Sequence, residues 1–497
     1  MGIVIRQSFY SSISAYIGVG IGYLNAIILM PLFMTPDEIG LMRAVMSIAL
    51  LLTTFSSFGT GAAIIRYFPL KGSTQEALNQ LFTFGLVVVL CAFSGLALTL
   101  HIFSEEFFRF FEDKSPEVGG YLILIIILVL QMTFFNLLEI TVRSQKEIII
   151  PNMIRDLAYK ILHTLIIFLY GFGQLNMQEY LFGMVVIYLI LIGLLTCFTF
   201  IRYKIRLDFK LLTNHTEFHT LINFSSVGIL TSLGYILMVQ IDQVMITKYL
   251  GLTENGIYTT AIFMVIAVEV PHRFVSQIST TLVSDNLAIG NLKELEDIYK
   301  KASINQFILG AFVFCLILIN LDNLYSIMPN GDKFVSGWWV FVVIGCVKLM
   351  DMTFSLNGEI IGYSKYYKFN LYALIVLGTG AIVLNWILIP IFGLIGAAIA
   401  SLIAYFIFNL LKLIFVRLRF GIMPFSNKTV LGLVIVILMV ILNFQFTSLS
   451  NPYYDVLVRS GVFTSIFILL TYKAALSDLF NSMCDQAHSM IIKYLKL

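Results

Sequence analysis

The chain has little charge for its size. Only 12% of its 497 residues are Asp, Glu, Lys or Arg, whereas 59% are hydrophobic. A soluble domain carries about 25% charged and about 45–50% apolar residues, so this chain has too few charged side chains to cover a water-facing surface. The mean hydropathy of +0.93 agrees. The composition excludes a soluble enzyme, a nucleic-acid-binding protein and a disordered scaffold, and it predicts an all-α polytopic membrane protein.

Cysteine pairs and nucleotide-binding motifs are also missing from the sequence. No two of the five cysteines are spaced as a CxxC or zinc pair, and no glycine-rich loop of the kind that holds nucleotide phosphates occurs. We therefore expect no metal centre, no ATP-driven step and no cofactor apart from a coupling Na⁺ or H⁺. The cysteines are interpreted as small hydrophobic side chains; they are Cys91, Cys197, Cys315, Cys346 and Cys484.

Long apolar runs are abundant. A helix that crosses a membrane needs about 20 apolar residues, and the sequence contains fourteen candidate runs with short polar segments between them. Residues 476–497 mix apolar and charged side chains, which predicts an amphipathic helix on the membrane surface. The predicted spans are 10–34, 41–68, 80–103, 120–143, 153–171, 179–201, 221–249, 257–283, 304–321, 336–361, 368–390, 393–416, 429–446 and 456–474.

The basic residues are distributed unevenly between the two ends of these spans. Of the 31 Lys and Arg residues, 22 lie on the same side as the N-terminus, six lie on the other side, and three lie within the spans. Because cytoplasmic loops of membrane proteins are enriched in Lys and Arg, we expect both termini to be cytoplasmic.

The sequence contains an internal repeat. Residues 34–41 and 250–257 follow the first and seventh spans and align Glu38 with Glu254 and Gly40 with Gly256 at an offset of 216; Glu139 and Glu359 align at an offset of 220. Six spans per repeat is an even number, so the two halves are parallel. The predicted organisation is an N-lobe (1–203), a cytoplasmic linker (204–220), a C-lobe (221–420), two further spans (421–475) and the tail (476–497).

Several short motifs resemble one transporter family. The segment QIDQVMITKYLG at 240–251, followed by ENGIY at 254–258, resembles the signature of the polysaccharide and O-antigen flippases, and PDEIGL at 36–41 and FGTGAAIIRY at 58–67 look like the matching N-lobe motifs. These flippases belong to the multidrug/oligosaccharidyl-lipid/polysaccharide exporter superfamily. The resemblance covers the whole chain in length, span number and repeat.

The resemblance implies a transporter rather than an enzyme. It implies two lobes that form a V-shaped central cavity in the bacterial plasma (inner) membrane. An undecaprenyl-diphosphate-linked oligosaccharide would cross there from the cytoplasmic to the outer leaflet by alternating access, for polysaccharide, O-antigen, lipopolysaccharide or capsule synthesis. The expected partners are this lipid-linked substrate, the bilayer, and the polymerase and glycosyltransferases of the same pathway, with no nucleic acid.

Charged residues inside the spans are the candidate functional residues, because a charge at the centre of a spanning helix costs about 2.5–3.5 kcal/mol. Glu269, His272 and Arg273 lie on one face of the eighth span. One reading is a structural Glu269–Arg273 pair. In the other, Arg273 binds the substrate diphosphate with bidentate hydrogen bonds, while Glu269 and His272 position it or exchange a proton.

Further candidates fall into the same two groups. Lys348 and Asp351 form an i, i+3 pair in the tenth span, either as a self-contained ion pair or with Lys348 attracting phosphate and Asp351 coupling a cation. Asp242 in the seventh span is either paired with Lys248 or part of the coupling-cation site. Basic residues near the predicted cytoplasmic mouth, which would attract an anionic head group, are Arg66, Arg143 and Arg155.

Three other functions remain as alternatives. A multidrug or cation extruder of the same superfamily commonly has twelve spans and an acidic residue in the first span, and this chain has neither feature. A lipid II flippase would carry basic residues in the first span, and here they are missing. An O-antigen polymerase needs a large outer loop, whereas the longest outer segment, 104–119, is short.

Overall fold

The computed structural model describes residues 17–443, 449–482 and 484–486. At residues 271, 273, 274, 277, 278 and 443 it describes the backbone but not the side chain. All regular secondary structure in these residues is helical, which confirms the all-α fold class. The chain divides into two compact units, unit 1 with Met1–Thr259 and Ala381–Leu394, and unit 2 with Thr260–Gly380 and Ile395–Leu497. The predicted lobe boundaries at 203 and 221 stay a prediction.

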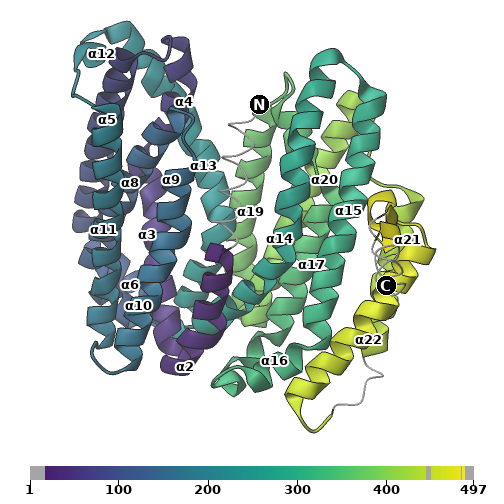
Figure 1. Cartoon of the computed structure of the whole chain (residues 1–497). Coiled ribbons are helices and arrows are strands. Elements are labelled where there is room, and N and C mark those ends of the chain that lie inside the picture. Colours follow the sequence, from purple (N-terminus) through teal and green to yellow (C-terminus); the bar gives the residue numbers. More distant parts are fainter. Residues whose placement is uncertain (1–16, 444–448, 483, 487–497) are drawn as a thin grey trace, which may run out of the picture. The chain divides into compact units, whose positions relative to one another are not determined.

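Unit 1 is a bundle in which α3, α5, α8, α11 and α13 pack along one another (Figure 1). Several of its helices begin at side-chain caps: Thr35 and Asn176 each form a capping box, with Glu38 and Glu179 respectively. Its elements are η1 (Leu24–Leu29), α2 (Met30–Phe33), α3 (Pro36–Ser57), α4 (Thr60–Leu70), α5 (Gln75–Ile102), α6 (Ser104–Phe111), α7 (Pro116–Gly120), α8 (Leu122–Ser144), α9 (Ile149–Asn152), η2 (Met153–Ala158), α10 (Tyr159–Gly171), α11 (Met177–Tyr203), α12 (Lys210–Thr213) and α13 (His215–Tyr249).

Unit 2 is built around α15, which packs against α17, α21 and α22. Three helices carry the chain between the units: α14 (Leu252–Ile289), α19 (Lys368–Phe392) and α20 (Leu394–Phe420). The remaining elements of unit 2 are α15 (Leu292–Ile319), α16 (Leu321–Ile327), η3 (Gly331–Gly337), α17 (Trp338–Phe354), α18 (Asn357–Gly362), α21 (Asn427–Asn443) and α22 (Pro452–Lys473).

The spans predicted from hydropathy correspond to helices in order along the chain. Within the described residues, ten helices are long and apolar enough to cross a membrane, and shorter apolar helices cover Ile17–Phe33 and Asn427–Leu442. The polar segment 284–303 between the eighth and ninth predicted spans is helical except at Gly290 and Asn291. Helix α14 continues to Ile289, and α15 begins at Leu292. Residues 10–16 of the first predicted span and 487–497 of the predicted tail lie outside the described residues.

Two predicted spans are interrupted. The run at 41–68 consists of α3 and α4, separated at Phe58 and Gly59, which both have left-handed φ values of 46° and 64°. The run at 336–361 consists of part of η3, α17 and α18, and it breaks at Ser355, where φ is 50°. Hydropathy cannot detect such breaks, because the residues on both sides of them are apolar.

The predicted linker 204–220 lies against the start of α5 in unit 1. The backbone N–H of Asp208 donates to Thr83 Oγ1 at 2.9 Å, and Lys210 Nζ lies 3.0 Å from Glu76 Oε1. The hydrogen bond and charge of the Glu76 carboxylate raise the pKa of Lys210. The linker therefore contains a short helix, α12, which an ion pair and hydrogen bonds tie to α5.

Residues aligned by the internal repeat meet in unit 1. A Cβ atom on Gly40 of α3 would overlap the carbonyl oxygen of Leu252, and one on Gly256 of α14 would overlap that of Pro36. Beside them, Thr253 Oγ1 donates to Asp37 Oδ1 at 3.1 Å, and these two residues are also 216 positions apart. The starts of α3 and α14 thus cross at backbone contact, which only glycine permits.

Candidate functional site

A buried carboxylate lies among polar side chains in unit 1. Asp242 of α13 is only 6% exposed. Its Oδ2 accepts a hydrogen bond from Tyr258 OH at 2.7 Å, and its Oδ1 accepts one from Asn385 Nδ2 of α19, also at 2.7 Å. The Oδ1 atom of Asn385 is buried and has no hydrogen-bond partner. A carboxylate beside an unsatisfied amide oxygen offers the oxygen ligands that hard cations take.

The neighbouring Lys248 does not serve as the ion-pair partner that the sequence suggested for Asp242. Its Nζ lies 3.8 Å from the ring centroid of Phe110 and 5.2 Å from that of Tyr249. A cation over an aromatic face is stabilised by the ring quadrupole. The polar contacts of Asp242 come instead from Tyr258 and Asn385, two residues that the sequence analysis did not select.

Two of the five basic candidates are held by one glutamate in unit 1. Glu139 of α8 is 4% exposed, and its Oε1 lies 2.7 Å from Arg143 NH2 and 2.6 Å from Arg155 NH1. Both arginines also donate to Asn152 Oδ1, at 2.9 Å and 3.2 Å. Arg155 lies in the π-helix η2, so one turn of irregular helix presents it to α8. Glu139 and Arg143 are four residues apart on α8, so this ion pair lies within one turn of the helix.

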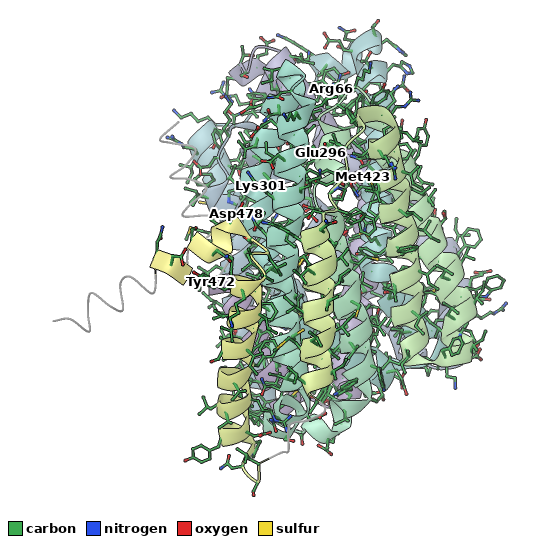
Figure 2. The ribbon with its side chains drawn as sticks, turned by 90° about the vertical axis from the view of Figure 1, so that its right-hand side faces the viewer. Arg66, Glu296, Lys301, Met423, Tyr472 and Asp478 are labelled. Carbon is green, nitrogen blue, oxygen red and sulfur yellow. The ribbon has the colours of Figure 1, made fainter. Side chains whose placement is uncertain are left out.

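Arg66 of α4 is the contrasting case. It is exposed, and among the described residues no carboxylate lies within 4 Å of it. The Cζ atom of its guanidinium lies 4.8 Å from the ring centroid of Phe224. Arg66 is labelled in Figure 2. Its charge is therefore available to an anionic ligand, whereas those of Arg143 and Arg155 are largely neutralised by Glu139.

In unit 2, the tenth-span lysine pairs with the eighth-span glutamate. Lys348 Nζ of α17 lies 3.2 Å from Glu269 Oε2 of α14. Asp351 accepts a hydrogen bond from Asn409 Nδ2 of α20 at 2.9 Å. The expected self-contained pair between Lys348 and Asp351 is therefore corrected, because each residue has a partner on a different helix.

His272 and Arg273 also lie in the part of α14 that belongs to unit 2. Nδ1 of His272 lies 3.0 Å from Oε1 of Gln306, and Gln306 Nε2 donates to Ser276 Oγ at 3.2 Å. His272 therefore contacts α15, while Glu269 contacts α17. The side chain of Arg273, the strongest phosphate-binding candidate in the sequence, lies outside the described residues.

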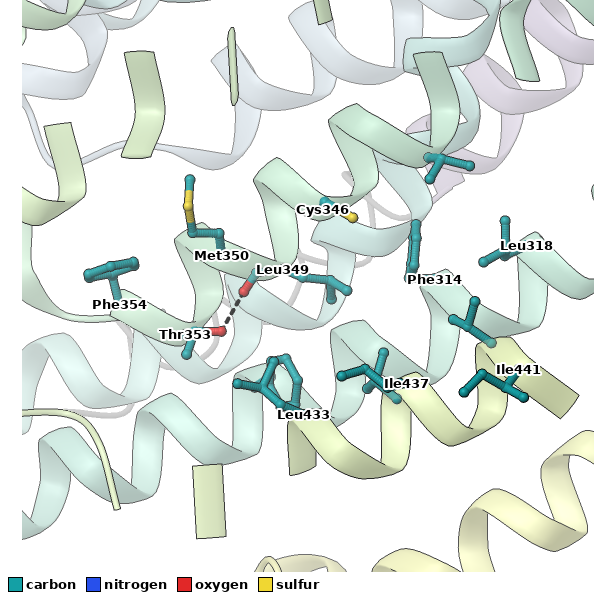
Figure 3. A pocket seen from close by; sticks show the side chains of 14 residues that line it. Phe314, Leu318, Cys346, Leu349, Met350, Thr353, Phe354, Leu433, Ile437 and Ile441 are labelled. Atoms are coloured by element: carbon teal, nitrogen blue, oxygen red, sulfur yellow. Dashed lines mark hydrogen bonds between the residues drawn. The ribbon is translucent and has the colours of Figure 1, made fainter. Parts of the chain in front are cut away.

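An apolar cavity of about 490 Å³ opens in unit 2 between α15, α17 and α21 (Figure 3). Phe314 and Leu318 come from α15, Cys346 and Leu349 from α17, and Ile437 is one of the lining residues of α21. The one labelled polar side chain is satisfied by its own helix, because Thr353 Oγ1 donates to the carbonyl oxygen of Leu349 at 2.6 Å. The cavity suits a hydrocarbon chain rather than a polar head group.

Sequence reasoning missed the residues that complete these contacts. Tyr258 and Asn385 lie 16 and 143 residues from Asp242, and Asn409 lies 58 residues from Asp351. The sequence did contain one indication of Asn385 and Asn409: each is an amide inside an apolar run, and a buried amide needs a hydrogen-bond partner. Which partner it finds depends on how the helices pack.

The comparisons with known proteins point to one family and one fold. The family described as polysaccharide biosynthesis protein matches residues 4–283. Among solved structures, a lipid II flippase MurJ in an inward-closed conformation superimposes with a TM-score of 0.72 at 14% identity, covering 94% of this chain and 99% of that chain. Among curated proteins none matches.

Two further solved structures share the fold. An inward-facing multidrug resistance MATE family transporter of the MOP superfamily has a TM-score of 0.60 at 14% identity, covering 84% of this chain and 94% of that one. A MOP superfamily transporter from Pyrococcus furiosus has a TM-score of 0.56 at 14% identity, covering 84% and 95%. At these identities the similarity shows the fold alone.

Proposed function

The chain belongs to the polysaccharide biosynthesis protein family, and on that premise we propose that it is a flippase for an undecaprenyl-diphosphate-linked oligosaccharide. In this proposal the lipid-linked sugar moves from the cytoplasmic to the outer leaflet of the bacterial inner membrane by alternating access. The family match over residues 4–283 is the observation that carries the proposal. The products would be O-antigen, lipopolysaccharide or capsular polysaccharide, with the pathway's polymerase and glycosyltransferases as partners.

The charges of the site support an anionic cargo. A diphosphate needs cationic donors that are not already neutralised, and arginine provides them in a planar, bidentate form. Among the basic candidates with a described side chain, Arg66 is exposed and has no carboxylate partner. We assign it the first contact with the diphosphate, and Arg273 the contact within the span. Arg143, Arg155 and Lys348 share their charge with Glu139 and Glu269.

The apolar cavity of unit 2 supports a lipid anchor on the cargo. Its lining by α15, α17 and α21 is hydrophobic, with a volume of about 490 Å³. Inside a membrane a hydrocarbon chain is already out of water, so close packing against the apolar lining is what would hold it. Part of an isoprenoid chain held there would keep the lipid bound while its head group crosses the membrane.

The buried carboxylate of unit 1 supports coupling to a cation. Asp242, with Tyr258 OH and the unsatisfied Oδ1 of Asn385 nearby, has the oxygen donors that a Na⁺ ion or a proton requires. The carboxylates Glu269 and Asp351 and the imidazole of His272 are further proton-exchange candidates in unit 2. A gradient of one of these ions would drive the cycle.

The proposal is tested with purified protein in liposomes that contain a fluorescent undecaprenyl-diphosphate oligosaccharide. Translocation is measured as the fraction of the lipid that becomes accessible to a membrane-impermeant quencher. The expected result is ion-gradient-dependent flipping. Lipid II and a cationic drug serve as parallel substrates: preferential transport of either one would overturn the proposed cargo.

The coupling role is tested with Asp242→Asn. Transport is expected to lose its dependence on the ion gradient because the neutral amide cannot bind a cation with the same charge. Glu105→Gln is the matched control, since Glu105 is an exposed carboxylate of α6 paired with Arg109 at 3.4 Å. Unchanged gradient dependence in Asp242→Asn would contradict the assignment.

A further inference from the structure

Polar side chains of α17 and α18 face polar side chains of α20 along the interior of unit 2. Lys348 Nζ lies 5.9 Å from the ring centroid of Tyr405, and Asp351 accepts a hydrogen bond from Asn409. Further along, Gly358 of α18 faces Lys412 of α20, and a Cβ atom on the glycine would lie 3.2 Å from Lys412 Nζ. We call this stripe the unit 2 polar ladder, with the residues Lys348, Asp351, Gly358, Glu359, Tyr405, Asn409 and Lys412.

Lys412 is the unusual member of the ladder. It is 8% exposed, in the middle of an apolar helix. Among the described residues, no carboxylate lies within 4.0 Å of its Nζ and no acceptor within hydrogen-bond distance. Its Nζ lies 4.2 Å from the ring centroid of Phe408, one turn earlier on α20. Burying an ammonium group without an ion-pair partner costs free energy, and loss of its proton removes that cost.

The break between α17 and α18 lies next to Lys412. Ser355 has a φ of 50°, and α18 begins two residues later at Asn357. The hydroxyl oxygen of Ser355 and Nδ2 of Asn357 are buried without hydrogen-bond partners. Non-helical backbone at membrane depth is tolerated where it is buried in protein or lines a water-filled cavity. The two unsatisfied groups at the break are therefore of the kind that an internal water would satisfy.

The internal repeat allows the carboxylate of this region to be compared with an equivalent one in unit 1. Glu139 and Glu359 occupy equivalent positions in the two halves. Glu139 is locked by Arg143 and Arg155. Glu359 is half-buried, and within the described residues no cation lies within ion-pair distance of it. Glu359 directly follows Gly358, which faces Lys412, and Asp351 is bonded to Asn409, three residues before Lys412 on α20. One repeat holds its glutamate between two arginines, whereas in the other no ion pair to the glutamate occurs among the described residues.

We propose that Lys412 is a proton-exchange residue: its ammonium releases a proton to solvent through a water at the α17–α18 break, and the neutral amine later takes up a proton by the same route. Each exchange changes the number of protons bound to the ladder by one, so it can be coupled to a pH gradient. It deepens the proposed transport function, on which its coupling role rests, by adding to unit 2 a proton site separate from Asp242 of unit 1.

Charged and polar groups from several helices surround this exchange, and Asn370 of α19 also reaches it by donating to the carbonyl oxygen of Gly358. Lys348 and Asp351 lie on α17, Glu359 lies on α18, and Tyr405 lies on α20. Glu269 of α14 pairs with Lys348, and Tyr299 of α15 donates a hydrogen bond to Asn357 Oδ1. The paired Glu269 and Lys348 stabilise each other's charge, whereas no ion pair to Lys412 or Glu359 occurs within the described part of the chain. The exchanging lysine therefore lies at the α18 end of the ladder.

A first experiment needs no substrate. The unfolding temperature of the full-length protein in detergent is measured across a pH series for the wild type, Lys412→Met and Lys412→Arg. Folded-state proton exchange at Lys412 is expected to give a pH-dependent change in the wild-type curve that both variants lack. Lys428→Met is the control, because Lys428 is a surface lysine paired with Asp478 at 3.2 Å. Wild-type and Lys412→Met curves of the same shape would overturn the proposal.

A second experiment connects the exchange to transport. Flipping of the fluorescent lipid-linked oligosaccharide is compared with and without a pH gradient. Lys412→Arg keeps the positive charge but cannot release a proton. We expect it to lose at least tenfold of the gradient-driven rate while it keeps the gradient-independent rate. Full gradient response in Lys412→Arg would show that charge alone suffices and would overturn the proposal. Wild-type protein that flips nothing would instead refute the proposed function, and the unfolding experiment would still decide the proton site.

Discussion

Charge pairing at single residues decides which basic side chains are available to a ligand. The sequence identified Arg273 as the strongest candidate and Arg66, Arg143, Arg155 and Lys348 as further ones, but spacing along the chain does not show which partner a side chain finds. The structure separates the last four: Glu139 neutralises two and Glu269 a third, whereas Arg66 stacks on an aromatic ring with no carboxylate near it among the described residues. The acids that do the neutralising were visible in the sequence, but Arg155 meets Glu139 only through the turn of η2.

This difference predicts that Arg66→Ala impairs transport. A hydrogen bond to a charged group contributes about 1.5–3 kcal/mol, and 1.4 kcal/mol is a factor of ten, so we expect a loss of about ten- to a hundredfold in flipping. Arg417→Ala, which removes an exposed arginine from the end of α20, is expected to keep the wild-type rate. Equal rates for the two variants would show that Arg66 does not contact the substrate.

A buried ion pair gives a stability prediction at the same scale. Asp455 of α22 is 1% exposed and its Oδ2 lies 2.7 Å from Arg459 Nε, while Asn323 Nδ2 of α16 also donates to it at 2.7 Å. Removing one partner of a buried pair costs about 3–5 kcal/mol, so Arg459→Met is expected to lower the unfolding temperature strongly.

The control for this prediction is a second i, i+4 pair, the exposed Arg109–Glu105 of α6. Exposed pairs contribute about 0–1 kcal/mol, so Arg109→Met is expected to leave the unfolding temperature nearly unchanged. A similar loss in the two variants would mean that the Asp455 pair is not buried in the folded protein.

At the scale of helices, hydropathy predicted the spans well but not their interruptions. Ten described helices have the length and composition of a span. Apolar runs of this length form helices because a spanning segment must satisfy its backbone hydrogen bonds internally. The breaks at Phe58 and Ser355 could not be predicted, since neither residue type favours a positive φ. Tertiary contacts must hold these backbones, and one of the breaks borders the proposed proton site.

The close crossing of α3 and α14 makes a specific prediction for two glycines. Gly40→Ala is expected to lower the unfolding temperature and to disturb transport, because the added methyl group would overlap the Leu252 carbonyl, a backbone atom that cannot rotate away. Gly95→Ala is the control, since nothing lies within 4 Å of a Cβ at that position in α5. Alanine there is expected to be neutral or slightly stabilising. A stable, active Gly40→Ala would contradict the crossing.

The apolar cavity predicts an effect that is specific to one face of α21. Val436 lines the cavity, whereas Val434, two residues away, is exposed and outside it. Val436→Trp fills part of the volume and is expected to reduce photolabelling of unit 2 by a photoreactive undecaprenyl lipid. Val434→Trp is expected to label as the wild type does. Equal labelling in both variants would show that the lipid chain does not bind in this cavity.

For the whole molecule, the distribution of charge predicts orientation. The excess of Lys and Arg on the side of the N-terminus predicts cytoplasmic termini. In a cysteine-free background, Thr213→Cys in α12 is expected to react with an impermeant thiol reagent only after the inner membrane is opened. Glu105→Cys in α6 is expected to react in intact spheroplasts. The reverse pattern would invert the topology.

The contact between Gly40 and Gly256 has an evolutionary consequence. In a symmetric dimer, a residue on the two-fold axis meets its own copy, and here equivalent positions of the two repeats meet in the same way. The crossing therefore has the geometry that two copies of a half-length chain would form by pairing about a two-fold axis. Substitutions at these two glycines are constrained jointly, since a side chain gained at either position strikes the backbone of the other repeat.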